Sequence, residues 1–370
     1  SDVGEQHIAY AHMTLVPKPT GVNEQKTKPT QQSTSLLNER GITPDFMFCR
    51  CEEWLTSSVV NKISTFTDVP SDEIYSCVDV DTVYKIPETF HVQGFHDSLA
   101  DELGIVSPSL QTYQAWRAVL ATNRQQPITV AIAGKYTDLE DSYASVVESL
   151  RHAEYEHGVD ITIDFIETTD GVAADVLGGA DAVIVPGGFG GRGIEGKIEV
   201  IRQARENDVA FLGICYGLQL AVVEYARHVC GFKDAHTTEV DEETPHPVVT
   251  MLDEQKEIEK KGGTMRLGGY DAELNPDSMI RDLYEERVED GCVRERHRHR
   301  YEVNPEYESV LEEYGLDIVG RMPDRGLVEF IELPGHPYFV GTQAHPELTS
   351  RLDDVAPLFD GLIQAAVKKM

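Results

Sequence analysis

The chain has 370 residues, of which 64 are Asp or Glu and 32 are Lys or Arg, so its formal net charge is −32. A chain this acidic repels polyanions, which argues against nucleic acid and against an anionic membrane surface as partners. Because the acidic residues are spread along the whole chain, they predict a folded acidic surface suited to a high-salt cytosol rather than a disordered tail.

The first 121 residues are predicted to form an α/β domain, one of the two or three domains that the length suggests. The chain starts without Met and enters a strand-like segment almost at once, which suggests a fragment that begins inside a domain. A polar, cation-bearing loop at 26–31 consists of Lys-Thr-Lys-Pro-Thr-Gln. The apolar patterns predict strands at 12–17, 46–49 and 74–78 and helices at 54–66 and 109–121.

A second α/β domain is predicted at residues 128–370, after a polar linker at 122–127. Its apolar runs are continuous, as in parallel strands that are buried on both faces, and helical patterns separate them. This alternation predicts an open, doubly wound sheet whose sites lie at the carboxyl ends of the strands. The expected strands are 128–133, 161–166, 182–186, 210–214 and 338–341, and the expected helices are 141–156, 194–207 and 216–229.

Membrane and disulfide signals are missing from the sequence. No apolar run approaches the roughly 18 residues that a membrane helix needs, and no secretory signal peptide is visible. The six cysteines lack the spacing of a disulfide scaffold, and Cys49 and Cys51 have no second pair to complete a zinc site. We therefore expect a cytoplasmic protein with reduced cysteines, no metal ligands in this chain and no contact with membranes or nucleic acids.

The strongest chemical signal is the segment 213–217, Gly-Ile-Cys-Tyr-Gly, where a buried strand is followed at once by a helix. Glycines on both sides allow a strained turn that presents Cys215 above the sheet, as in a nucleophile elbow. A helix that starts beneath a thiol favours its thiolate form. A lone cysteine at a strand end is usually structural, but this context favours a nucleophile.

A thiol nucleophile needs a base, and the base needs an acid that orients it. The segment His345-Pro346-Glu347 follows the strand predicted at 338–341, and its spacing lets the carboxylate reach the imidazole. His-x-Glu alone is a weak motif. In the same domain as the elbow, it predicts a triad of Cys215, His345 and Glu347.

Acyl transfer also needs amide N–H groups that face the developing oxyanion. We expect one from Tyr216, directly after the nucleophile, and another from the glycine-rich segment 186–193. That segment lacks the Gly-Lys-Ser/Thr ending of a phosphate-binding loop, and its spacing fits a dinucleotide fingerprint poorly. Its amides are therefore expected to face a carbonyl oxygen.

The basic run from Arg294 to Arg300 has two interpretations. On its own, such a run is typical of a nucleic-acid or phosphate patch. Within a chain of net charge −32, contacts with a substrate carboxylate or between domains are favoured.

Three motifs in this order, Pro-Gly-Gly at 186–188, Gly-x-Cys-x-Gly at 213–217 and His-Pro-Glu at 345–347, resemble the class I glutamine amidotransferase domain. The resemblance extends to the CTP synthase family over essentially the whole chain. It implies a flavodoxin-like amidotransferase domain preceded by part of a P-loop-like synthetase domain. The further motifs that carry it are 187–197, 263–268 and 296–304 in the second domain and 26–31 and 79–87 in the first.

For glutamine, the resemblance implies a γ-glutamyl thioester at Cys215, with His345 as base and then acid and Glu347 as its orienting carboxylate. A carboxylate and a guanidinium would match the two fixed charges of the amino acid. The residues implied in glutamine binding are Gly188, Tyr216, Gly217, Leu218, Gln219, Glu239 and Arg300.

For nucleotides, the resemblance implies a UTP or CTP site in the first domain, at Lys26, Thr27, Lys28, Pro29, Thr30, Gln31 and Lys62. Taken alone, such lysines are usually solvated surface charges, but lysine is scarce in this chain. The resemblance also implies ATP and Mg²⁺ in the full-length enzyme and a homotetramer. The lid associated with GTP as activator is implied at Phe189, Arg192 and Glu195.

The sequence departs from the family pattern in two places. It contains no Gly-x-x-x-x-Gly-Lys-Ser/Thr loop, so the first domain is expected to be truncated and the chain to retain only the glutaminase half of the ligase reaction from UTP to CTP. Ala344 stands where the family commonly has an aromatic residue. Two alternatives stay open, namely the glutaminase of another synthase, such as that of GMP or carbamoyl phosphate, and a non-catalytic module that binds nucleotide and assembles oligomers.

Overall fold

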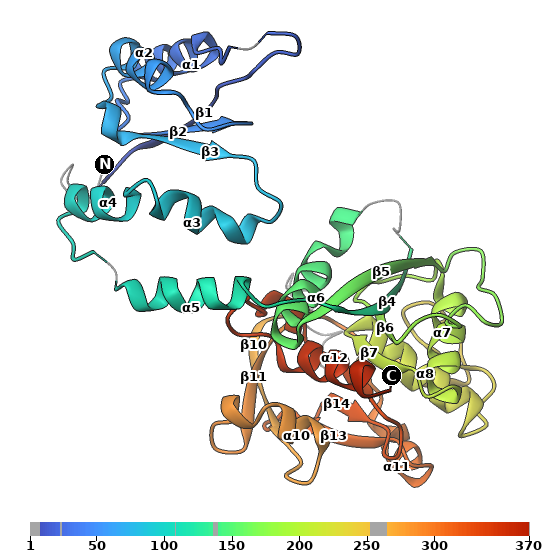
Figure 1. The fold of residues 1–370 in the computed structure, drawn as a ribbon. Coiled ribbons are helices and arrows are strands. Elements are labelled where there is room, and N and C mark those ends of the chain that lie inside the picture. Colours follow the sequence, from blue (N-terminus) through green and yellow to red (C-terminus); the bar gives the residue numbers. More distant parts are fainter. Residues whose placement is uncertain (1–7, 23, 108, 136–139, 252–264, 370) are drawn as a thin grey trace. The chain divides into compact units, whose positions relative to one another are not determined.

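The computed structural model describes residues 8–22, 24–107, 109–135, 140–251 and 265–369. The chain splits into two compact units, Ser1–Ala121 and Thr122–Met370, each with its own sheet and hydrophobic core (Figure 1). Within the described residues, no helix is both long enough and apolar enough to cross a membrane.

The first unit is built on a small parallel sheet with helices on both faces. Its strands lie in the order β1 (Ala11–Leu15), β2 (Phe46–Cys51), β3 (Ile74–Val78). Its helices are α1 (Lys28–Asn38), α2 (Ser57–Thr67), α3 (Ile86–His91), α4 (Phe95–Leu103) and α5 (Leu110–Leu120). Neighbouring residues of β2 point to opposite faces, so Met47 packs with Ile63 of α2, whereas Phe48 packs with Phe95 of α4.

The second unit contains a nine-stranded mixed sheet. Its parallel strands lie in the order β5 (Val159–Glu167), β4 (Gln126–Gly134), β6 (Ala182–Val185), β7 (Ala210–Ile214), β15 (Phe339–Thr342). Numbered along the chain this order is 2-1-3-4-5, which is the flavodoxin-like order. Antiparallel strands continue the sheet beyond β15, in the order β14 (Val328–Glu332), β13 (Asp317–Arg321), β10 (Arg266–Leu274), β11 (Cys292–His299). A separate small sheet comprises β12 (Glu302–Val303), β9 (His246–Thr250) and β8 (Ala235–Thr237).

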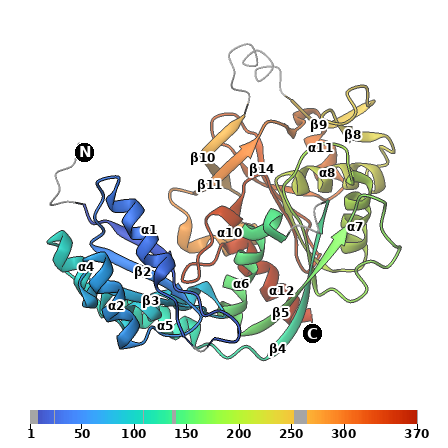
Figure 2. The same ribbon diagram turned by 90° about the horizontal axis from the view of Figure 1, so that it is seen from above.

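Alternate residues of the parallel strands enter two hydrophobic cores, one on each face of the sheet. The helices of this unit are α6 (Ala144–His157), α7 (Ile194–Glu206), α8 (Tyr216–His228), α10 (Met279–Leu283), α11 (Pro305–Glu313) and α12 (Pro357–Lys369). Ile184 and Leu212 pack with α6 and α12, which lie side by side (Figure 2). Val183 and Phe211 pack with α7 and α8 on the other face. The sheet is therefore doubly wound.

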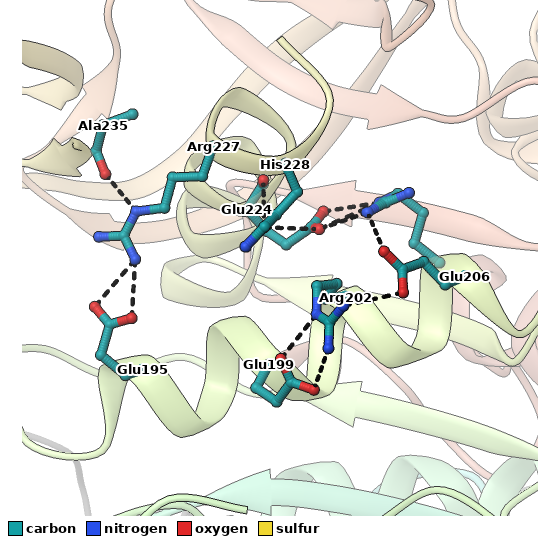
Figure 3. A network of polar contacts seen from close by, with 9 residues as sticks. Glu195, Glu199, Arg202, Glu206, Glu224, Arg227, His228 and Ala235 are labelled. Carbon is teal, nitrogen blue, oxygen red and sulfur yellow. Dashed lines mark hydrogen bonds and ion pairs between the residues drawn. The ribbon is translucent and has the colours of Figure 1, made fainter. Parts of the chain in front are cut away.

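Charged side chains tie α7 to α8 (Figure 3). Arg205 of α7 donates to both carboxylate oxygens of Glu224 on α8, at 3.0 Å from Nε and 2.8 Å from Nη2, and the Glu224 side chain is fully buried. Arg202 pairs instead with Glu199 and Glu206 on its own helix, where all three side chains are partly exposed. The Arg205–Glu224 pair therefore holds α8, and the turn before it, against α7.

Most predicted elements form near their expected bounds, and the differences have local causes. β4 begins at Gln126, so the last two residues of the predicted linker 122–127 are strand residues that pair with β5. The helix predicted at 54–66 begins only at Ser57. Thr56 caps this helix, because its side chain accepts a hydrogen bond from a backbone N–H of the first turn.

We expect Arg205→Met to destabilise the second unit by about 3 kcal/mol, because it leaves the carboxylate of Glu224 buried without its main partner. Arg202→Met is the matched control. Its carboxylate partners are partly exposed, so the expected loss is below about 1 kcal/mol. Thermal or denaturant unfolding measures both variants, and equal stabilities would show that the Arg205–Glu224 pair does not hold the two helices together.

Candidate active site

Cys215 occupies the turn between β7 and α8 and is 4% exposed. Its φ of +53° lies in the left-handed region that residues other than glycine rarely adopt. Its N–H donates to the carbonyl of Thr342, at the end of β15, at 2.7 Å. The backbone is thus sharply bent and held by a neighbouring strand, as a nucleophile elbow requires.

Two glycines make this turn sterically possible. A Cβ on Gly217 would lie 2.0 Å from the carbonyl oxygen of Val185 on β6. A Cβ on Gly213 would lie 2.8 Å from the backbone carbon of Gly217. Neither position leaves room for a side chain, so the first turn of α8 packs directly on the ends of β6 and β7.

His345 and Glu347 follow the end of β15, as predicted. His345 Nδ1 lies 2.6 Å from Glu347 Oε1, and the backbone N–H of His345 donates to the carbonyl of Arg296 on β11 at 2.7 Å. Nε2 of His345 and Oε2 of Glu347 are buried, and neither has a hydrogen-bond partner among the described residues. With Nδ1 committed to the carboxylate, Nε2 is the ring nitrogen left for the thiol.

Gly187 brings the imidazole and the thiol together. A Cβ on this glycine would lie 2.8 Å from Cε1 of His345 and 3.7 Å from Cβ of Cys215, so both side chains border the same small residue. Burial by itself would lower the pKa of His345, but the neighbouring Cys215 and Glu347 raise it to about 10. A raised pKa favours the imidazolium, which is the partner that a thiolate needs.

The glycine-rich segment between β6 and α7 borders the elbow. A Cβ on Gly188 would lie 3.6 Å from Cδ1 of Tyr216, and the Tyr216 hydroxyl donates to the carbonyl of Gly190 at 2.9 Å. Tyr216, which is expected to supply one oxyanion amide, therefore neighbours the glycine-rich segment that is expected to supply the other. The same Cβ position on Gly188 lies 3.5 Å from Nζ of Lys197.

Glu239 lies beside the same segment and accepts the N–H of Gly190 at 2.9 Å. Burial raises the pKa of Glu239, whereas the hydrogen bond from Gly190 and the charge of Arg300 act to lower it. Arg300 is thus within electrostatic reach of Glu239, and the expected carboxylate and guanidinium lie in one neighbourhood.

Two of the predicted glutamine contacts lie in the interior. Leu218 is fully buried and Gln219 is 2% exposed. The side-chain amide of Gln219 donates to the carbonyl of Tyr301 at 3.0 Å and to Oε1 of Gln343 at 3.1 Å. The side-chain N–H groups of Gln219 therefore bond to other residues of the protein.

The basic run forms strand β11, and its side chains alternate between solvent and core. The outward-facing residues are Arg294, Arg296 and Arg298, and the inward-facing residues are Glu295, His297 and His299. Arg294 pairs with Asp271 at 2.8 Å. Burial and the charge of Arg266 lower the pKa of His297 to about 3, so this histidine adds no positive charge at neutral pH. At neutral pH the positive charge of this run is therefore carried by its arginines.

The predicted lid residues lie on the exposed part of the glycine-rich segment and at the start of α7. Phe189 is 68% exposed, and Arg192 is also exposed. Lys135, directly after β4, donates to the carbonyl of Phe189 at 2.6 Å and lies 4.5 Å from the centroid of its ring. Glu195 pairs with Arg227 of α8 at 2.9 Å (Figure 3).

In the first unit, the loop at 26–31 leads into α1 and is partly committed to internal bonds. Thr30 is buried and donates to the carbonyl of Leu15 at 3.1 Å, and Gln31 donates to Oγ1 of Thr27 at 3.0 Å. Lys26 pairs with Glu24 at 2.6 Å. These contacts shape the loop and leave fewer of its side chains for a ligand.

A cavity of about 360 Å³ lies beside this loop in the first unit. Thr27 and Lys62 line it, together with Lys18, which carried no prediction. Lys28 and Pro29 are exposed at the start of α1 and do not line it. Of the residues predicted to bind a nucleotide, the structure therefore places Thr27 and Lys62 at this cavity.

In the parts of the chain that the structure describes, no group of three or more His, Cys, Asp or Glu could hold a metal ion. All six cysteines are free thiols, and Cys215 is the one that lies beside an imidazole.

Two family models match the chain: "Glutamine amidotransferase class-I" matches residues 138–365, and "CTP synthase N-terminus" matches residues 1–105. The CTP synthase of Methanopyrus kandleri is 48% identical over 98% of this chain and 68% of its own length. The chain belongs to the CTP synthase family. The family's Thermococcus kodakarensis member is 45% identical over 99% of this chain and 69% of its own length.

A solved structure agrees with the family assignment. The CTPS glutaminase domain of Trypanosoma brucei, with bound acivicin, has a TM-score of 0.61 at 34% identity, over 65% of this chain and 94% of its own. Both parts of a glutamine-hydrolysing CTP synthase are therefore represented in the chain. The expectation of a truncated synthetase domain is not borne out, since the N-terminal family model matches residues 1–105.

Two lysines at the site escaped prediction. Lys135 follows β4 at the point where the order of the parallel strands reverses, and such points mark binding sites in doubly wound sheets. Lys197 shares the buried stripe of α7 with Ile194 and Ile201, so a charged residue on an apolar stripe was the available signal.

Gly217→Ala is expected to destabilise the second unit by about 3 kcal/mol, because the new methyl group would meet the carbonyl oxygen of Val185. Gly179→Ala is the control, since Gly179 is exposed, has an ordinary φ and has nothing within 4 Å of its Cβ position. Thermal unfolding compares the two variants. A Gly217→Ala chain as stable as the control would contradict the close packing of the elbow.

Proposed function

We propose that the chain hydrolyses glutamine to glutamate and ammonia at Cys215, and that the ammonia serves the ATP-dependent amination of UTP to CTP. The observation that carries this proposal is the buried arrangement of Cys215, His345 and Glu347 at a strand–helix elbow. Family membership supports UTP as the acceptor of the ammonia.

Cys215 is the nucleophile in this proposal. Its thiolate sulfur bonds to the amide carbon of the glutamine side chain, and the carbonyl oxygen takes up the negative charge. The protonated His345 gives its proton to the nitrogen as the C–N bond breaks, and ammonia leaves. Water then attacks the γ-glutamyl thioester while His345 accepts a proton from it, and breaking of the C–S bond releases glutamate and restores the thiolate beside the protonated imidazole.

The amides of Gly188 and Tyr216 would donate to the oxygen of each tetrahedral intermediate. Donors fixed before the reaction cost no reorganisation when the charge develops, which is why such sites contribute strongly to rate. The packing of Gly188 against Tyr216 supports this assignment. Glu347 keeps the imidazole in the orientation and tautomer that the transfers require.

The fixed charges of glutamine would be matched by the charges beside the elbow. Glu239 would hold the α-amino group and Arg300 the α-carboxylate, and their mutual electrostatic reach supports this. Gly217, Leu218 and Gln219 would form the floor behind the substrate.

In the first unit, Lys62 and Thr27 at the cavity support a site for the triphosphate of UTP or CTP. The other loop residues in this proposal are Lys26, Lys28, Pro29, Thr30 and Gln31. Phe189, Arg192 and Glu195 would form the lid that responds to GTP, and the resemblance favours a homotetramer. Because the described residues hold no acidic cluster that fits Mg²⁺, no step is assigned to that ion.

Cys215→Ala is expected to abolish glutamine hydrolysis while the thermal unfolding midpoint stays near that of the unmodified chain, because the variant removes one sulfur and leaves the turn. Cys230→Ala removes another free thiol of the same unit and should keep full activity. Release of glutamate from glutamine is the measurement. Hydrolysis that survives in Cys215→Ala would refute the proposed mechanism.

A further inference from the structure

Lys197 is a buried cation whose role the triad chemistry does not explain. Its side chain is 2% exposed, yet its ammonium makes no hydrogen bond or ion pair with any residue that the structure describes. It lies 5.5 Å from the centroid of the Tyr216 ring. A mostly buried ammonium group is costly unless negative charge compensates it. The carboxylate of Glu167 acts on Lys197 through its charge but without a hydrogen bond, so negative charge that develops nearby during the reaction would compensate the ammonium further.

The surroundings of Nζ show where that charge would arise. Nζ lies 3.5 Å from the Cβ position of Gly188 and faces the ring of Tyr216. These are the two residues whose amides would face the oxyanion. Two charges at the ends of β4 and β5 shift the pKa of Lys197 in opposite directions. Lys135, directly after β4, lowers it, and Glu167, the last residue of β5, raises it.

We propose that Lys197 is a positioning residue of the glutaminase, whose buried ammonium supports Gly188 and Tyr216 and adds positive potential where the oxygen of the tetrahedral intermediate becomes negative. This inference rests on the proposed function. In a buried site, a charge acts over several ångströms with less screening than in water. The attraction grows as the substrate oxygen gains charge, so it lowers the barrier more than it strengthens substrate binding.

The charge on Lys197 depends on pH within the working range of an enzyme. Burial, followed by repulsion from Lys135, lowers the pKa of Lys197 from 10.5 to about 8. Glu167 opposes this lowering, and Tyr216 stays neutral because burial raises the pKa of its phenol above the usual value. Lys197 is therefore charged at pH 7 and loses its charge as the pH rises through about 8.

Steady-state glutaminase kinetics of the full chain test this proposal with Lys197→Met, which keeps the length of the side chain and removes its charge. At pH 7 we expect kcat to fall by about tenfold with KM within about twofold, because the lost interaction forms only in the transition state. Lys233→Met, which removes an exposed lysine from the same unit, is the control and should match the unmodified chain.

The pH profile separates this role from a merely structural one. The kcat of the unmodified chain should approach that of Lys197→Met as the pH rises through about 8, because both then carry no charge at this position. Groups that titrate in both proteins change both kcat values alike, so their effect cancels in the ratio of the two kcat values. The unfolding temperature of Lys197→Met should equal or exceed that of the unmodified chain, since an unpaired buried charge has been removed.

Each outcome decides. A tenfold ratio at pH 7 that closes above pH 8 supports the role of Lys197. A ratio near one at pH 7, or a deficit that is constant over pH whatever the unfolding temperature, overturns it while leaving the proposed function intact. An unmodified chain without Cys215-dependent hydrolysis overturns both.

Discussion

The bend of the backbone at Cys215 is the constraint on which the site depends. A residue with a side chain is held in a left-handed conformation, and the turn exists because Gly217 lets α8 touch the carbonyl of Val185. The strand β15 secures the bend through the hydrogen bond from Cys215 to Thr342, and the same strand leads to His345. Cys215 and His345 are therefore held by two neighbouring strands of one sheet, which is a rigid way to keep two side chains in register.

Two buried charged groups lie on α7 and α8, the helices that pack near this turn. The pair of Arg205 and Glu224 joins α7 to α8, whereas Lys197 borders Gly188 of the glycine-rich segment, and Glu167 acts on it through its charge without a hydrogen bond. The first arrangement is satisfied within the protein and serves packing. The second has no hydrogen-bonded anion among the described residues, and the charge proposed to complete it is that of the reacting substrate, which is why the two are assigned different roles.

The features of the fold that have a local signature can be predicted from the sequence. The apolar runs at 182–185 and 210–214 and the glycines around Cys215 were sufficient to predict the parallel core and the elbow. The antiparallel strands were missed because β11, with arginines outward and histidines inward, has the composition of a surface patch. The inward burial of Lys197 was missed because a lysine in a helix usually faces solvent. The contact between Gly187, His345 and Cys215 follows from tertiary packing, which no short motif specifies.

The pKa of His345 is the most direct test of the central claim that thiol, imidazole and carboxylate form one unit. An NMR titration of this imidazole should give a pKa far above the usual 6.5 in the unmodified chain, because Cys215 and Glu347 outweigh burial. In Cys215→Ala the pKa should fall, since burial remains and the thiol does not. A pKa that is ordinary in the unmodified chain, or unchanged by Cys215→Ala, would contradict the account.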